Sequence, residues 1–184
     1  MTSITPAPAE SALVLIDVQE RLVPAMSGFA PVSDRIKLLL KGAAALDMKI
    51  IACEQYPQGL GHMLPEFSEL LPTGSPIIEK RGFSAFAADG FDTVLRDAGI
   101  RNLVFCGIES HVCVLQSVCH ALENGFSAML AADATTSRKV EDRELALAHA
   151  RAAGATVLSA EALLFALLGS STHPAFKTIS RLVR

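Results

Sequence analysis

Three side chains suited to nucleophilic chemistry stand at the ends of predicted strands. Asp17 ends the first apolar strand, Lys80 ends the third, and Cys113 follows the fourth in the opening turn of a helix. Ser110 is a good N-cap for that helix, so we expect free backbone N–H groups and the positive end of the helix dipole to face the thiol. With Lys80 nearby, this placement predicts a Cys113 pKa below the free value of about 8.5.

These three groups would make a nucleophilic site that needs no histidine. The Cys113 thiolate would attack a carbonyl or similar centre, and free N–H groups of the same turn would hold the oxyanion. Asp17 would accept the thiol proton and return it to a leaving group, while Lys80 would hold charge and orientation. The sequence therefore predicts hydrolysis of a small molecule at a C–N or related bond.

The elements that must position these residues alternate along the chain. Apolar and β-branched runs predict six strands, at residues 12–18, 49–53, 76–80, 103–108, 127–132 and 156–159. Helical periodicity and terminal glycines predict helices at 35–46, 91–98, 110–124, 140–153 and 160–168. This alternation predicts an α/β protein: a three-layer α/β/α fold with a parallel six-stranded Rossmann-like sheet. Ligands bind at the carboxyl ends of such strands, where the three residues stand.

Composition and charge narrow the class of protein. The 184 residues fit a single domain, with a core at about 12–168. A net charge of −3 without a basic cluster predicts no nucleic-acid partner. No apolar run reaches the roughly 20 residues of a membrane span, and the first ten residues do not resemble a secretory signal, so we expect a cytoplasmic protein. An apolar fraction of 51% and an amphipathic tail at 173–184 predict a homo-oligomer, a dimer or larger.

Three sequence blocks, in order, resemble those of a known enzyme family. They are Leu15-Ile16-Asp17-Val18-Gln19, residues 79–86 (EKRGFSAF) and residues 106–116 (CGIESHVCVLQ). On these blocks the chain resembles the isochorismatase-like cysteine hydrolases, the family that also contains nicotinamidases and N-carbamoylsarcosine amidase.

The resemblance implies roles for particular residues. Asp17, Lys80 and Cys113 would be the catalytic triad, and the backbone N–H groups of Glu109 and Cys113 would form the oxyanion hole. A non-proline cis peptide would join Ile108 to Glu109. Family members commonly form homo-oligomers.

One departure from the family concerns a metal site. Nicotinamidases carry an Asp-x-His metal site after the second strand, where this chain has Cys53-Glu54-Gln55-Tyr56-Pro57. The nearby His62 and Glu54 alone make a poor metal site, so we predict no metal and no cofactor, and nicotinamide becomes a less favoured substrate. The segment resembles the isochorismatase domain-containing subgroup. Isochorismate, an amide and a carbamoyl compound all remain open as substrates.

Secondary candidates and rival functions complete the prediction. Candidate pocket residues are Gln19, Tyr56, Phe83, Phe86 and His111. The other three cysteines are expected to pack in the core. One alternative function is a non-catalytic scaffold of the same fold. Another is a redox sensor, which is disfavoured because we expect no resolving cysteine beside the nucleophile.

Overall fold

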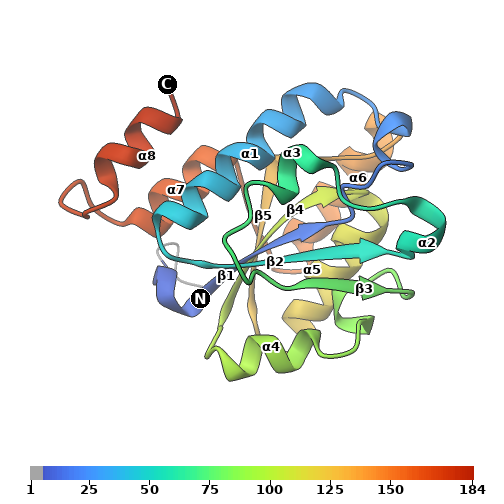
Figure 1. Cartoon of the computed structure of the whole chain (residues 1–184), viewed down its shortest axis with the longest axis horizontal. Helices are drawn as coiled ribbons and strands as arrows, with labels where there is room; N and C mark the ends of the chain where they lie inside the picture. The colour runs from blue at the N-terminus through green and yellow to red at the C-terminus, as the bar shows by residue number, and fades with distance from the viewer. Residues whose placement is uncertain (1–5) are drawn as a thin grey trace.

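The computed structural model describes residues 6–184 and contains one all-parallel sheet of six strands. The strands are β1 (Ser11–Ile16), β2 (Lys49–Gln55), β3 (Ile77–Lys80), β4 (Asn102–Ile108), β5 (Ser127–Thr136) and β6 (Thr156–Leu158). Their order is β3-β2-β1-β4-β5-β6, the doubly wound order. Figure 1 labels β1 to β5. The predicted single-domain α/β/α fold with a parallel six-stranded sheet is confirmed.

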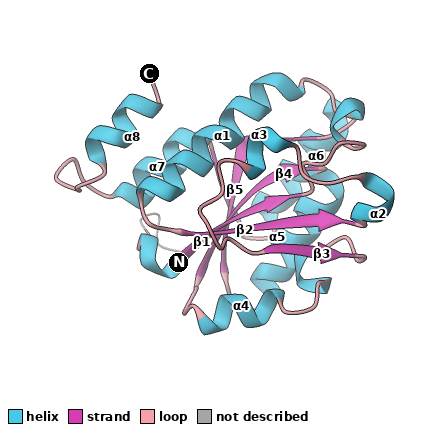
Figure 2. Cartoon of the chain, in the orientation of Figure 1, coloured by secondary structure: helices cyan, strands magenta, loops and turns pink. Residues whose placement is uncertain are grey.

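Helices cover both faces of the sheet (Figure 2). One face carries α1 (Phe29–Ala45), α3 (Pro65–Ser68), α7 (Ala160–Leu168) and α8 (Phe176–Leu182). The other carries η3 (Ala85–Ala87), α4 (Phe91–Asp97), α5 (Leu115–Glu123) and α6 (Val140–Ala152). The short elements η1 (Pro8–Glu10), η2 (Val23–Ala25), α2 (Pro57–Leu60) and η4 (Ser110–Val114) lie in connections.

The core divides into two apolar clusters because the central strands are buried on both faces. Alternate residues of β1 point to opposite sides, so Leu13 and Leu15 join the cluster under α1 and α7, whereas Val14 and Ile16 join the cluster under α4 and α5. Every residue of β1 is buried. This rigid centre carries the strand ends at which the candidate residues lie.

Several element boundaries differ from the prediction. The helix expected at 35–46 begins earlier, at Phe29. Pro31 is compatible with this start because it lies in the first turn, where its missing N–H breaks no helical hydrogen bond. Strand β5 continues past Asp133 to Thr136 instead of ending at residue 132. The helix expected at 110–124 divides into a π-helical turn, η4, and the α-helix α5.

The C-terminal tail packs on its own chain. Ile179 of α8 is fully buried in the cluster under α1, and Phe176, Leu182 and Val183 pack against that cluster. The apolar side of the tail, which we expected to cover a neighbouring subunit, therefore contributes to the core of this chain. Among residues 6–184, no helix is long and apolar enough to cross a membrane.

Candidate active site

Asp17 and Lys80 form a buried ion pair at the carboxyl end of the sheet. Lys80 Nζ lies 2.7 Å from Asp17 Oδ2, and neither side chain has exposed surface. Asp17 directly follows the central strand β1 and Lys80 closes the edge strand β3, so the lysine spans the width of β2. A buried pair of this kind requires additional hydrogen bonds to satisfy its remaining donors and acceptors.

Lys80 obtains these hydrogen bonds from residues on two sides. Its ammonium donates to Gln55 Oε1 at 2.7 Å and to the carbonyl of Phe83 at 2.9 Å, and the carbonyl of Gly82 lies at 3.5 Å. The sequence analysis missed Gln55, because it ended the second strand at residue 53. The strand continues to Gln55, which pairs in register with Lys80.

Asp17 is held in an uncommon backbone conformation, with φ at +51°. Its N–H donates to the carbonyl of Cys53, and its Oδ1 is buried without a hydrogen-bond partner of regular geometry among the described residues. Burial raises the pKa of Asp17 to about 6, although the Lys80 charge and hydrogen bonds from Lys80 and Cys113 oppose the rise. Such a carboxylate can exchange a proton near neutral pH.

Cys113 lies in η4, directly after β4, and its side chain is almost entirely buried. The peptide between Ile108 and Glu109 is cis. Gly107 has φ at +110°, and a Cβ added there would lie 2.1 Å from the carbonyl oxygen of Ile16. Close contact between β1 and β4 at this point brings the turn that carries Cys113 beside Asp17.

The expected low pKa of Cys113 is wrong. Burial, and then the Asp17 carboxylate, raise the pKa of the thiol to about 12, and Lys80 lowers it only in part. Loss of hydration and a nearby negative charge both disfavour the thiolate, and here they outweigh the lysine and the helix dipole. The resting thiol therefore keeps its proton, and Asp17 is the neighbouring group able to remove it.

The expected capping role of Ser110 is also wrong. Residue Glu109 occupies the N-cap position and makes no side-chain cap, while Ser110 Oγ lies 2.8 Å from Thr135 Oγ1. Thr135 in turn donates to the carbonyl of Gly107. The serine therefore ties the turn to β5, which holds the end of β4 in place.

Ser117 is a second residue that the sequence analysis missed. Its hydroxyl donates to the carbonyl of Cys113 at 2.6 Å and accepts the N–H of Ala85 at 2.8 Å. It joins the turn that carries Cys113 to the segment after β3, whose Phe83 carbonyl accepts a hydrogen bond from Lys80. A serine four residues along a helix gives no sequence signal for such a bridge.

Two candidate pocket residues are occupied by contacts within the protein. The Gln19 amide donates to the carbonyls of Gln55 and Gly61 and accepts the N–H of Gln55, which favours a positioning role over contact with a substrate. His111 Nδ1 lies 2.9 Å from Ser137 Oγ, so its ring is directed at the loop after β5.

The three aromatic candidates occupy different environments. Phe86 packs edge to face on Phe91, with ring centroids 5.0 Å apart, and belongs to the core. Phe83 is 53% exposed, while its carbonyl holds Lys80. Tyr56 is partly exposed beneath the Arg81 guanidinium, 3.9 Å from the ring centroid. Phe83 and Tyr56 are therefore exposed to a ligand, whereas Phe86 is half-buried against the core.

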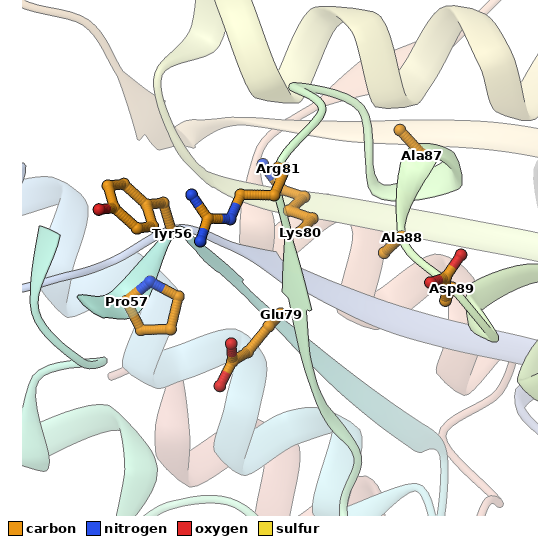
Figure 3. Close-up of a pocket in the computed structure, with 8 residues that line it drawn as sticks. All are labelled: Tyr56, Pro57, Glu79, Lys80, Arg81, Ala87, Ala88 and Asp89. Atoms are coloured by element: carbon orange, nitrogen blue, oxygen red, sulfur yellow. The ribbon is translucent and has the colours of Figure 1, made fainter. Parts of the chain in front are cut away.

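A small pocket lies beside Lys80 at the carboxyl end of β3 (Figure 3). Its volume is about 200 Å³, and Tyr56 lines one side with Arg81 stacked against it. The full lining is Tyr56, Pro57, Glu79, Lys80, Arg81, Ala87, Ala88 and Asp89. The pocket combines one aromatic face with cationic and anionic groups, which suits a small polar molecule.

Glu54 and His62, the pair considered for a metal, bond to each other. Glu54 Oε1 accepts the N–H of Met63 at 2.7 Å, and Glu54 Oε2 lies 3.1 Å from His62 Nδ1. The hydrogen bond with Glu54 raises the pKa of His62. In the part of the chain that the structure describes, no three or more histidine, cysteine or acidic side chains gather as a metal site would require.

Comparison with known proteins places these features in a family. Residues 11–162 match the family described as Isochorismatase domain. The chain is 33% identical to isochorismatase domain-containing protein 1 of Salmo salar, over 96% of this chain and 62% of that protein. It is 35% identical to isochorismatase domain-containing protein 2 of Bos taurus, over 96% of this chain and 84% of that protein. The chain thus spans less than two thirds of the first of these relatives.

Solved structures share the fold. A structure described as MAR1 ribonuclease from Caenorhabditis elegans superposes with a TM-score of 0.91 at 35% identity, covering 97% of this chain and 91% of that chain. YcaC from Pseudomonas aeruginosa, solved with covalent acrylamide, has a TM-score of 0.89 at 23% identity, covering 97% of this chain and 91% of that chain. YcaC from Escherichia coli, described as an octameric hydrolase of unknown specificity, has a TM-score of 0.90 at 20% identity, covering 99% of this chain and 92% of that chain. The likeness to the two YcaC proteins extends to the fold alone.

Proposed function

Because this chain belongs to the isochorismatase family, we propose that it is a cysteine hydrolase in which Cys113 is the nucleophile and Asp17 is its proton acceptor. The observation that carries the proposal is the buried Asp17–Lys80 pair beside a thiol that keeps its own proton. Burial gives Asp17 a pKa of about 6, so it is ionised at neutral pH and able to act as a base.

The proposed reaction proceeds through a covalent thioester. As Asp17 takes the Cys113 proton, the sulfur attacks the substrate carbonyl carbon, and the carbonyl electron pair moves to oxygen. When the tetrahedral oxyanion collapses, the C–N bond breaks and Asp17 returns the proton to the leaving nitrogen. Asp17 then removes a proton from water as the water attacks the thioester carbon. When this second tetrahedral intermediate collapses, the C–S bond breaks and Asp17 returns the proton to the sulfur, which releases the acid and restores the thiol.

The backbone N–H groups of Glu109 and Cys113 are the proposed oxyanion donors. No hydrogen bond in residues 6–184 engages the Glu109 N–H, which supports this assignment. Each well-placed donor to a developing oxyanion contributes about 3–4 kcal/mol to the transition state. The pocket of about 200 Å³ beside Lys80 favours a small substrate, with Tyr56 as its aromatic contact.

Acrylamide addition and a substrate screen together test the proposal. Acrylamide is a suitable electrophile because its activated double bond alkylates cysteine thiols once they lose their proton. We expect one adduct per wild-type chain, located at Cys113, and none at that position in Cys113→Ser. Cys119→Ser is the matched control, because it removes the one cysteine of the four that is not buried. It should keep the Cys113 adduct.

The screen uses amides, carbamoyl compounds and isochorismate-like ethers with wild type and Cys113→Ser. Wild-type hydrolysis that is lost in Cys113→Ser supports the proposal, and full hydrolysis by Cys113→Ser would overturn it. A scaffold role predicts no adduct and no turnover. A redox sensor predicts sulfenic acid at Cys113 after mild peroxide, but the raised pKa of this buried thiol disfavours that role.

We do not extend the ribonuclease description of the Caenorhabditis elegans protein to this chain. The chain has a net charge of −3, so it lacks the excess of cationic groups that attracts a phosphate backbone. A homo-oligomer stays a prediction, supported by the exposed side chains of Val140 and Leu145 on α6. Light scattering at micromolar concentration tests it, and a monomer would contradict it.

A further inference from the structure

All three N–H groups of the Lys80 ammonium are used within the protein. An ammonium has three donors, and Lys80 directs them at Asp17 Oδ2, Gln55 Oε1 and the Phe83 carbonyl, at 2.7, 2.7 and 2.9 Å. The side chain has no exposed surface. No donor is left for a substrate, so the lysine acts on the reaction through Asp17.

The amide of Gln55 is fixed in one orientation. Its Nε2 donates to the Arg81 carbonyl at 2.8 Å, and its own backbone N–H donates to Gln19 Oε1 at 2.7 Å. A flipped amide would turn an NH₂ group toward the ammonium of Lys80 and an oxygen toward a carbonyl, and both contacts are repulsive. The Gln55 amide is therefore held at its oxygen by Lys80 and at its nitrogen by the Arg81 carbonyl, while the Gln19 contact holds its backbone.

We propose that Gln55 is a positioning residue, which holds the Lys80 ammonium on Asp17 and thereby sets the pH range in which Asp17 accepts the Cys113 proton. This proposal rests on the proposed function. Without the Gln55 oxygen, one N–H of a buried ammonium would lose its partner, and Lys80 would be free to move away from Asp17. The positive charge of Lys80 would then stabilise the ionised form of Asp17 less against the cost of burying it.

Few titratable groups face this pair. They are the thiols of Cys113 in η4 and Cys53 in β2, and burial raises the pKa of both. Asp17, with a pKa of about 6, is thus the group whose titration falls within a practical pH range. The rate of acrylamide addition to Cys113 should rise with pH through this value, because the ionised carboxylate removes the thiol proton.

The test measures that rate against pH in Gln55→Glu and Gln55→Met. The new carboxylate in Gln55→Glu repels the ionised form of Asp17, so we expect the midpoint to move upward by about one pH unit. Gln55→Met removes the acceptor without adding charge and should also move the midpoint upward; it serves alone if Gln55→Glu does not fold. Gln58→Glu is the matched control, because Gln58 is exposed and bonds Glu79, and its midpoint should not move.

The outcomes separate this proposal from the proposed function. Folded Gln55 variants that keep the wild-type midpoint would overturn the positioning role and leave the proposed function intact. A wild-type rate with no midpoint near pH 6, or one unchanged in Asp17→Asn, would overturn both. A purely structural role for Gln55 would lower the melting temperature without moving the midpoint.

Discussion

Replacing Lys80 by methionine should raise the pKa of Asp17, so that its ionised, basic form is present only at higher pH. The substitution keeps an unbranched chain of similar length and removes the charge that lies 2.7 Å from Asp17 Oδ2. Opposite unit charges about 4 Å apart interact by about 4 kcal/mol at an effective dielectric constant of about 20. At about 1.36 kcal/mol per pKa unit, losing this interaction raises the pKa of Asp17 by about three units, from about 6 to about 9.

The sign of the effect follows from which form of Asp17 is the base. The ionised carboxylate accepts the Cys113 proton, so reactivity is present above the pKa of Asp17 and is lost as the pH falls through it. At about pH 7.5 the ionised share falls from about 97% to about 3% when the pKa rises from about 6 to about 9. We expect acrylamide addition to Cys113 to slow about 30-fold at this pH.

Intact mass measured over time, from about pH 5 to about pH 10, gives the rate at each pH. In Lys80→Met the rate should recover above about pH 9, where Asp17 is again ionised. Lys41→Met is the control, because Lys41 is exposed on α1, and it should keep the wild-type profile. A Lys80→Met protein that is unaffected at about pH 7.5, or equally slow at every pH, would refute the reasoning.

Two further predictions concern stability and are measured by urea unfolding. Gly107→Ala should lower the free energy of unfolding by at least about 3 kcal/mol, because its Cβ would lie 2.1 Å from the Ile16 carbonyl oxygen at a φ of +110°. Gly125→Ala, also at positive φ but in open space, should lose only about 1 kcal/mol, and equal losses would contradict the argument. Ile179→Ala should lower the free energy of unfolding by about 2–4 kcal/mol, since this side chain is fully buried. Lys177→Ala is the control, and it should change the free energy of unfolding little because Lys177 is exposed. If the tail served only a neighbouring subunit, the two variants would be equally stable as monomers.

The fold was predictable because its signals are local. The apolar run that forms β1 and the glycines that follow several helices give the order of elements, and β-α-β units allow few arrangements. Boundaries were less predictable where a polar residue continues an element. The second strand was ended at Cys53, yet β2 continues to Gln55, because pairing with β3 supplies backbone partners that a propensity rule does not include.

The sequence by itself determined that Asp17 and Lys80 stand at the ends of strands and that Cys113 stands in the first turn after one, because the apolar runs stop at or just before these positions. Only the tertiary structure decided how they act. The depth at which they are buried raises the pKa of Cys113 and of Asp17, reversing the prediction of a resting thiolate. The tertiary structure also places the side-chain oxygen of Gln55 2.7 Å from the Lys80 ammonium nitrogen. Desolvation and hydrogen-bond partners depend on residues distant in the chain, so no local pattern encodes them.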